Sequence, residues 1–280
     1  MSPSAESGLV AIDVGSSRIK LGWFPPPTAC TSEGLTDGLP ITTLRLPQPE
    51  ATLALTHRKA DPGDLIAKMD QWLEPFSWKS ARRLLASVFP DVNPLVAELL
   101  QDRPRQITAG DLPLQVRVDQ PDKVGIDRLL IAVVANRLRE PHRGAIAISL
   151  GTVTTVNRIG VEGAFEGGAI LPGLAMSSAA LHAGTSSLPY VRADSAARPP
   201  AAVGMSTSGA IAGGLYWGAV GAIRTVAELQ TRPDEPPPHV FVTGGDAPLL
   251  ADQLEIAGAP VCHVPHMVLV GMAIAAASVS

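Results

Sequence analysis

A strand–turn–strand pattern occurs twice in this chain, about half a chain length apart. Apolar runs at 9–13 and 19–24 are joined by a Gly/Ser turn, and residues 144–159 repeat the arrangement around a Gly-Thr turn. The copies read DVGSSRIK from position 13 and SLGTVTTV from position 149. Two related lobes leave this kind of internal similarity in a sequence. We therefore expect two similar α/β lobes rather than one large core.

The length of the chain supports two lobes. The chain has 280 residues, and single cores stop growing near about 250 to 300 residues. A hydrophobic content of 46% is ample for a folded α/β protein. We expect an N-terminal lobe over residues 1–143, with the first Gly/Ser turn, and a C-terminal lobe over residues 144–280, with the second.

Periodicity predicts the other elements. Apolar residues three and four apart favour a helix over 62–72, and a strand-like stretch at 80–89 precedes a helical one at 91–100. Further helices are expected within 177–184, 208–230 and 267–277, and a buried strand, a glycine turn and a helix start within 239–254. The segment 25–40, rich in Pro, Gly and Thr, is predicted to be an irregular loop.

Charge and cysteine content exclude several classes of partner. The net charge is −4 and the basic residues are scattered, so neither nucleic acid nor an anionic membrane surface is an expected partner. Cys30 and Cys262 are far apart and lack metal spacing, which favours a reducing compartment. No run of about 18 apolar residues occurs, and the start lacks a signal-peptide pattern. We expect a cytoplasmic protein that acts on small molecules.

The two hairpin turns and a third glycine turn are candidate phosphate-binding loops. A turn of small residues exposes consecutive backbone N–H groups and lets an anion approach them closely. Asp13, before the first turn, is placed to hold hydrated Mg²⁺, and Lys20 adds positive charge. The third turn, VTGGDAP at 242–248, resembles turns that lie against a nucleotide. Each could instead be an ordinary polar turn, with Asp246 a helix cap, but three together favour nucleotide binding.

A fourth candidate lies at 122–137, where Gly125, Asp127 and Arg128 precede a helix that is apolar almost all round. Such a helix is buried, so its N-terminus is well fixed. The carboxylate can accept a proton from an alcohol while the guanidinium binds an anionic end of the substrate. The alternative is an N-cap aspartate beside a surface arginine.

Together these motifs resemble those of the type III pantothenate kinase family, within the acetate-kinase, sugar-kinase, Hsp70 and actin superfamily. DVGSSRIK stands for the family's D-x-G-N-[ST]-x-x-K, VGIDR for G-x-D-R, and SLGTVTT for D-x-G-T-A-T-T. The matching segments keep their order from residue 9 to residue 273, which is far more specific than one glycine turn. The resemblance implies two RNase H-like (actin-like ATPase) lobes with an interlobe cleft. It also implies ATP-dependent phosphorylation of pantothenate to 4'-phosphopantothenate, the first step of coenzyme A biosynthesis, by a homodimer.

The resemblance also implies a role for each matched residue. Asp127 would be the general base, and Mg²⁺ would lie near Asp13. Pantothenate would be bound by Gly125, Ile126, Asp127, Arg128 and, across a homodimer interface, Thr207. ATP would be bound by Asp13, Val14, Gly15, Ser16, Ser17, Arg18, Ile19, Lys20 and Thr152.

Two departures from the family pattern matter. Ser149 replaces the aspartate that helps the family hold K⁺ or NH₄⁺, and a neutral hydroxyl binds such a cation less firmly than a carboxylate. The cation requirement is therefore in question for this chain. Ser16-Ser17 replaces Asn-Thr/Ser, which keeps a hydroxyl and removes an amide donor. Two alternatives follow: a catalytically weak, nucleotide-binding regulatory relative, which Ser149 favours, and another small-molecule kinase, which the GIDR match disfavours.

Overall fold

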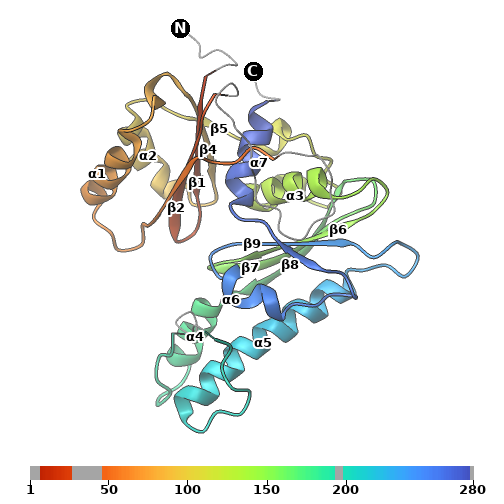
Figure 1. The fold of residues 1–280 in the computed structure, drawn as a ribbon. Coiled ribbons are helices and arrows are strands. Elements are labelled where there is room, and N and C mark those ends of the chain that lie inside the picture. Colours follow the sequence, from red (N-terminus) through yellow and green to blue (C-terminus); the bar gives the residue numbers. More distant parts are fainter. Residues whose placement is uncertain (1–6, 27–45, 193–197, 278–280) are drawn as a thin grey trace. The chain divides into compact units, whose positions relative to one another are not determined.

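The computed structural model describes residues 7–26, 46–192 and 198–277 (Figure 1). The irregular loop predicted at 25–40 lies outside the described residues except for its first two positions. The chain forms two compact units. The first comprises Met1–Leu114, Asp119–Arg137 and Met267–Ser280, and the second comprises Gln115–Val118 and Leu138–His266.

The first unit is built on a five-stranded sheet with the order β3-β2-β1-β4-β5. Its strands are β1 (Leu9–Val14), β2 (Arg18–Phe24), β3 (Ala51–Thr56), β4 (Arg82–Ser87) and β5 (Arg105–Gln106). β2 is antiparallel to both β1 and β3, whereas β1 runs parallel to β4 and β4 to β5. Every residue of the central strand β1 is buried, as its apolar run LVAIDV requires.

Helices cover both faces of this sheet (Figure 1). They are α1 (Pro62–Leu73), α2 (Asn93–Leu100), α3 (Ile126–Leu138) and α7 (Met267–Ala276), with short 3-10 turns at Trp78–Ser80, Pro90–Val92, Ala109–Asp111 and Pro121–Lys123. The side chains of Val10, Ile12 and Val14 join the core formed with α1 and α2. Because side chains alternate along a strand, Ala11 and Asp13 point to the opposite face, on which α3 and α7 lie.

The second unit repeats this plan. Its strands are β6 (Ala145–Leu150), β7 (Val153–Ile159), β8 (Phe165–Pro172), β9 (His239–Thr243) and β10 (Val261–His263), in the order β10-β9-β6-β7-β8. β7 is antiparallel to β6 and β8, whereas β6 runs parallel to β9 and β9 to β10. Its helices are α4 (Leu174–Ala183), α5 (Thr207–Leu229) and α6 (Ala247–Leu250), with a 3-10 turn at Ala251–Gln253. The long helix α5 buries Tyr216, Val220 and Ile223 against this sheet.

Both sheets therefore have the same strand order and the same strand directions, which is the RNase H-like arrangement. The predicted fold of two similar α/β lobes is confirmed, and the two hairpins recognised in the sequence are the first two strands of each sheet. The predicted cleft between the lobes stays a prediction.

The division of the chain differs from the expected boundary between residues 143 and 144. The second unit begins at Leu138, at the last residue of α3, and it includes the short segment Gln115–Val118, which pairs with Phe165 of β8. The C-terminal helix α7, expected in the second lobe, packs in the first unit against β1, β2 and β4. Gly22 of β2 makes room for it, since an added Cβ would lie 3.1 Å from Leu269 Cδ1.

Candidate functional site

The turn between β1 and β2 has the backbone geometry of an anion-binding loop. It is closed by a hydrogen bond from Gly15 N to Arg18 O, 3.0 Å long. The N–H groups of Ser16 and Ser17 donate to no group among the described residues, and both residues are half-buried. Two neighbouring backbone donors in a turn of small side chains form a concave site for an anion.

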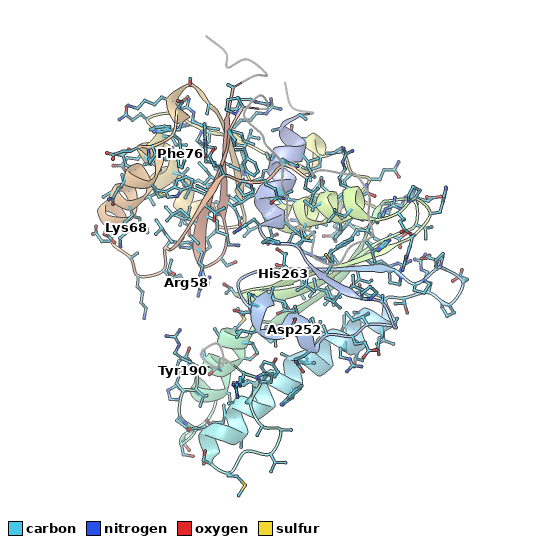
Figure 2. All side chains as sticks on the ribbon, in the orientation of Figure 1. Arg58, Lys68, Phe76, Tyr190, Asp252 and His263 are labelled. Atoms are coloured by element: carbon cyan, nitrogen blue, oxygen red, sulfur yellow. The ribbon has the colours of Figure 1, made fainter. Side chains whose placement is uncertain are left out.

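The carbonyl groups of the same turn are held by residues that follow β3. His57 Nε2 lies 2.9 Å from Gly15 O, Arg58 Nε donates to Ser16 O at 3.0 Å, and His57 N donates to Ser17 O at 3.2 Å. Figure 2 shows Arg58 beyond the end of β3. Sequence analysis gave these two residues no role, because they are 42 positions from the turn they contact.

Asp13 is the last but one residue of β1, and it is 4% exposed. Its cross-strand partner in β2 is Lys20, whose Nζ lies 3.5 Å from Asp13 Oδ2. Burial raises the pKa of Asp13, and the nearby Asp127 raises it further, whereas Lys20 lowers it. The predicted neighbourhood of Asp13 and Lys20 is confirmed, and the pair follows directly from the hairpin register.

Asp127 lies in the first turn of α3, where its Oδ1 accepts a 2.9 Å hydrogen bond from Arg128 N. Burial raises the pKa of this carboxyl, while the hydrogen bond and the charges of Arg128 and Lys20 oppose that shift. Gly125 leaves room for this carboxylate, since an added Cβ would lie 2.6 Å from Asp127 Oδ1 and would displace it. Residues Leu129 to Ala135 are all buried, so the helix fixes the carboxylate firmly.

Arg128 is half-buried rather than a free surface side chain. Burial lowers the pKa of its guanidinium, and the charge of Asp127 raises it. A surface arginine beside a capping aspartate was the alternative interpretation, and the burial of both side chains argues against it. A guanidinium partly withdrawn from water binds a carboxylate or phosphate more strongly than an exposed one.

Asp13, Lys20 and Asp127 thus form one electrostatic group within the first unit, in which Lys20 lowers the pKa of both carboxyl groups and Asp127 raises the pKa of Asp13. Mg²⁺ is held in proteins by one or two carboxylates together with substrate phosphates and water. One buried carboxylate, Asp13, and one half-buried carboxylate, Asp127, beside an anion-binding turn fit such an ion. Among the described residues no cluster of three or more His, Cys, Asp or Glu side chains could hold a metal.

The second unit places its small-residue turns together at one edge of its sheet. Thr152 O accepts a hydrogen bond from Gly173 N at 3.2 Å, and Asp246 N donates to Leu150 O at 3.1 Å. Gly244 has φ of +108° and lies so close to Leu150 that an added Cβ would be 2.0 Å from its carbonyl oxygen. The turns at 151–152 and 244–246 are therefore neighbours, as nucleotide binding by both would require.

The helix that follows the third turn is shorter than the sequence suggested. α6 has four residues, and Asp246 at its N-cap makes no capping hydrogen bond with its side chain. The feature of this turn that matters for the site is therefore the close approach of its backbone to β6, and not the N-terminus of a helix.

Ser149 is the residue that the resemblance matches to a cation-binding carboxylate. It pairs directly with Thr155 of β7 and Thr243 of β9, so the three side chains that share this face all carry hydroxyl groups. Thr155 Oγ1 accepts a hydrogen bond from Asn157 Nδ2 at 3.0 Å. A set of neutral hydroxyls does not fit a site that depends on a carboxylate for K⁺ or NH₄⁺.

Thr207 is the first residue of α5 and is exposed. The helix is capped before it by Ser206, whose Oγ accepts a 3.1 Å hydrogen bond from Gly209 N. Thr207 is therefore free of the capping role and keeps its hydroxyl available to solvent.

Two units with the RNase H-like strand order, each carrying a turn of small residues after its first strand, define the actin-like class of nucleotide-binding α/β proteins. Residues 9–229 match the model of a more particular family, type III pantothenate kinase. The chain belongs to this family.

Relatives in this family come from several bacteria. A type III pantothenate kinase of Chlorobium luteolum is 31% identical over 242 residues, which cover 83% of this chain and 82% of the relative. One from Cereibacter sphaeroides is 36% identical over 168 residues, 60% of each chain, so here the match spans less than two thirds of the relative's length. A crystal structure of a conserved Baf family protein from Campylobacter jejuni shares the fold, with a TM-score of 0.55, 15% identity and coverage of 95% and 96%.

None of the helices in the described part of the chain is long and apolar enough to cross a membrane.

Proposed function

We propose that this chain transfers the γ-phosphoryl group of ATP to the hydroxyl of pantothenate, giving 4'-phosphopantothenate and ADP. The observation that carries the proposal is the placement of Asp127. Its carboxylate lies in a half-buried helix start beside Arg128 and interacts with Asp13 and Lys20 at the end of the β1–β2 hairpin. An alcohol base and a phosphate-binding turn are thus held in one unit.

Asp127 would act as the general base. The pantothenate hydroxyl oxygen attacks the γ-phosphorus, the bond from that phosphorus to the β–γ bridging oxygen breaks, and the hydroxyl proton passes to the Asp127 carboxylate. Because burial raises the pKa of Asp127, this carboxylate is a stronger base than an exposed one. Phosphoryl transfer needs positioning and charge neutralisation more than a strong base, so a moderate shift suffices.

Arg128 would bind the pantothenate carboxylate, and Gly125 and Ile126 would complete that site, because they directly precede Asp127 at the start of α3. The N–H groups of Ser16 and Ser17, which have no acceptor within the part of the chain that the structure describes, would bind phosphate oxygens, as part of an ATP-binding segment from Asp13 to Lys20. Asp13 would hold Mg²⁺ through its water, and the bound ion would offset the charge of the phosphates.

In the second unit, Thr152 and the neighbouring turn at 244–246 would contact the nucleotide. Thr207 would contact pantothenate bound to the partner subunit of a homodimer, a role consistent with its exposed position. The resemblance to the family also supports a cytoplasmic location. No role is assigned to K⁺ or NH₄⁺, because the hydroxyl side chains around Ser149 do not fit the family's cation site.

The direct test is an assay of ADP formation with and without pantothenate, at several K⁺ concentrations, joined to measurement of ATP binding by calorimetry. ADP formation that requires pantothenate supports the proposal. ATP binding without turnover would instead support a nucleotide-binding regulatory protein, the alternative that Ser149 favours. Turnover only with a different alcohol would show that this alcohol, and not pantothenate, is the substrate.

The substitution Asp127→Asn tests the base. It keeps the shape of the side chain but removes its ability to take a proton, so kcat should fall by about 100-fold or more while the Kd for ATP stays nearly constant. The exposed Asp122, in the turn before α3, provides the matched control Asp122→Asn, which should leave kcat unchanged. A near-normal rate in the Asp127 variant would remove this residue from the base role.

A further inference from the structure

The β1–β2 turn is held by a pair of residues from outside the hairpin. Three successive carbonyl groups, those of Gly15, Ser16 and Ser17, accept hydrogen bonds from His57 and Arg58 at 2.9, 3.0 and 3.2 Å. The pair directly follows β3, which is paired with β2 up to Arg18 opposite Thr56. The sheet register therefore brings the pair against the turn.

These contacts fix the orientation of the turn. With its carbonyls bonded to His57 and Arg58, the N–H groups of Ser16 and Ser17 stay without a partner among the described residues. A turn whose carbonyl oxygens could rotate freely would lose this arrangement, since exposed carbonyls repel an anion and exposed N–H groups attract it. Preorganised donors bind an anion without a further cost of reorganisation.

The side chain of His57 is held in place for its contact with Gly15 O. It is 8% exposed, and its ring lies 5.3 Å from the ring of Phe89, so its orientation is set by packing. A carbonyl oxygen can only accept, so Nε2 must carry the proton in the bond to Gly15 O. This bond occupies the Nε2 position, and the side chain acts through the turn rather than on a substrate.

Arg58 has guanidinium N–H groups that its contact with the turn does not use. Its Nε is used by Ser16 O, whereas its two terminal nitrogens have no partner among the described residues, and the side chain is exposed. The other basic side chain at this turn with a defined contact, Lys20, already faces Asp13. A guanidinium held by one N–H beside two free backbone donors presents its remaining N–H groups for paired bonds to phosphate oxygens.

The geometry points to a two-residue extension of the phosphate site. Arg58 binds the phosphate oxygens of the nucleotide directly, and His57 is a positioning residue that holds the β1–β2 turn in its anion-binding conformation. This inference rests on the proposed function for the identity of the anion, an adenine nucleotide. It also explains how the turn keeps its shape with Ser16 in place of the family's asparagine, because the support comes from the end of β3.

Arg58 is tested by binding of ATP, ADP and adenosine to the purified full chain, measured by calorimetry. Arg58→Ala should weaken ATP and ADP by about 10-fold or more, the usual effect of losing a charged hydrogen-bond donor, and leave adenosine unchanged. Arg103→Ala removes an exposed arginine that makes no side-chain contact with the turn, and it should leave all three affinities unchanged. Equal ATP affinity in wild type and Arg58→Ala, or an equal loss for adenosine, overturns the role of Arg58.

His57 is tested with a matched pair of variants. His57→Phe keeps the aromatic contact with Phe89 and removes the donor, whereas His57→Gln replaces Nε2–H by an amide N–H at nearly the same place. We expect His57→Phe to raise the KM for ATP by about 10-fold with little change in the KM for pantothenate, and His57→Gln to restore most of the affinity. Equal losses in both variants, or equal rises in both KM values, would show a role in folding only.

The outcomes separate this inference from the proposed function. If the wild-type chain binds ATP but does not phosphorylate pantothenate, the proposed function is wrong. The test of Arg58 still applies, because it measures binding. His57→Phe and His57→Gln are then compared by their Kd for ATP. Wild-type turnover with an unchanged Arg58→Ala affinity defeats only the role of Arg58. Wild-type chain that binds neither ATP nor ADP defeats both.

Discussion

Asp13 shows how the site lowers the stability of the first unit. The carboxyl is almost fully buried, and Lys20, its ion-pair partner among the described residues, is itself 38% exposed in its side chain, so the charge is incompletely compensated. Burial and the charge of Asp127 raise the pKa of Asp13 above 3.8. Charge of this kind is retained at functional sites although it opposes folding.

The variant Asp13→Asn should therefore be more stable than wild type at neutral pH. Between 3.8 and the raised pKa of Asp13, the folded state binds more protons than the unfolded state, so wild-type stability falls as pH rises through this window. Asparagine cannot ionise and escapes that loss. Urea unfolding from about pH 4 to pH 8 should show the advantage of the variant growing with pH.

The same variant should gain less stability from Mg²⁺ and ATP than wild type does, because the ligand that would hold the ion is gone. A variant that is less stable than wild type over the whole pH range would show that Lys20 compensates the Asp13 charge fully. A variant with unchanged stabilisation by Mg²⁺ and ATP would remove Asp13 from the ion site.

Residues close in sequence were predictable and residues brought together by the sheet were not. Asp13 and Lys20 pair across one hairpin, and Gly125, Asp127 and Arg128 are consecutive or nearly so, so local patterns identify both groups. His57 and Arg58 reach the turn only through the β2–β3 register. A sequence does not reveal that register, because β3 is an edge strand whose residues alternate between half-buried and exposed.

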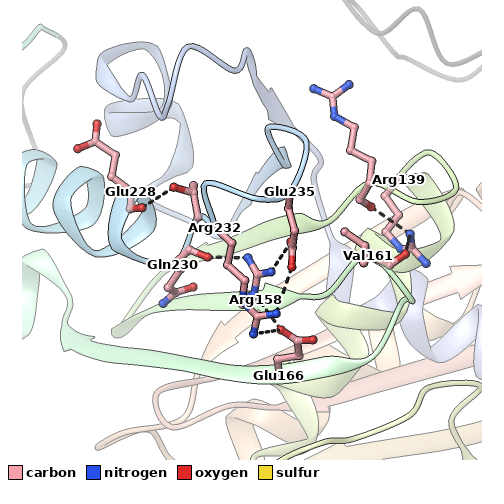
Figure 3. Close-up of polar contacts among 10 residues, drawn as sticks. Arg139, Arg158, Val161, Glu166, Glu228, Gln230, Arg232 and Glu235 are labelled. Carbon is pink, nitrogen blue, oxygen red and sulfur yellow. Dashed lines mark hydrogen bonds and ion pairs between the residues drawn. The ribbon is translucent and has the colours of Figure 1, made fainter.

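At the scale of elements, the second unit is closed by a buried ion-pair network between β7, β8 and the end of α5 (Figure 3). Arg158 of β7 contacts Glu166 of β8 at 2.9 Å and Glu235 at 2.5 Å, and it donates to Gln230 O at 2.6 Å. Burial would lower the pKa of Arg158, and the bonds to Glu235 and Glu166 raise it. The guanidinium thus ties the segment after α5 to the sheet.

Removing Arg158 should destabilise the second unit strongly. Arg158→Ala leaves two carboxylates, each less than a fifth exposed, with Arg232 as the one ion-pair partner among the described residues. We expect a loss of about 3 kcal/mol in the free energy of unfolding, measured with urea. Arg117→Ala breaks an ion pair whose side chains are 50% and 66% exposed, and it should cost less than about 1 kcal/mol. Similar losses in the two variants would show that burial adds nothing to the network.

Elements were predictable where their apolar period is strong. The hairpins became β1–β2 and β6–β7, and the predicted helices at 62–72, 208–230 and 267–277 became α1, α5 and α7 with no end shifted by more than one residue. β3 was not predicted. β5 and β10 were not predicted either, because they have two and three residues and no period can be read from them. β5 and β10 form because each pairs in parallel with the neighbouring strand at the edge of its sheet, which is a tertiary effect.

At the scale of the whole molecule, the chain returns at its end to the unit in which it began. α7 is apolar on all sides, and Met267, Leu269, Val270 and Met272 are all buried. The sequence of α7 predicts that the helix is buried but does not indicate against which sheet. The helix was therefore expected in the second lobe, which precedes it directly in the chain. The helix belongs to the first unit, where it packs against β1 and, through Gly271, against α3.

The contact at Gly271 makes the dependence of the first unit on α7 testable. An added Cβ would lie 2.4 Å from Leu130 O, a backbone atom of the buried helix α3 that cannot move aside easily. Gly271→Val should therefore destabilise the first unit by about 2 kcal/mol, the usual cost of overpacking. Amide hydrogen exchange should rise in β1, β2 and α3 and change little in β6 and β7.

Gly218→Ala in α5 is the matched control, because an added Cβ there meets nothing within 4 Å. That variant should gain up to about 1 kcal/mol from the higher helix propensity of alanine, with no faster exchange in either unit. If Gly271→Val instead speeds exchange first in β6 and β7, α7 stabilises the second unit and the division of the chain is wrong. Exchange confined to α7 itself would mean that the helix frays alone, and that β1, β2 and α3 hold together without the end of the chain.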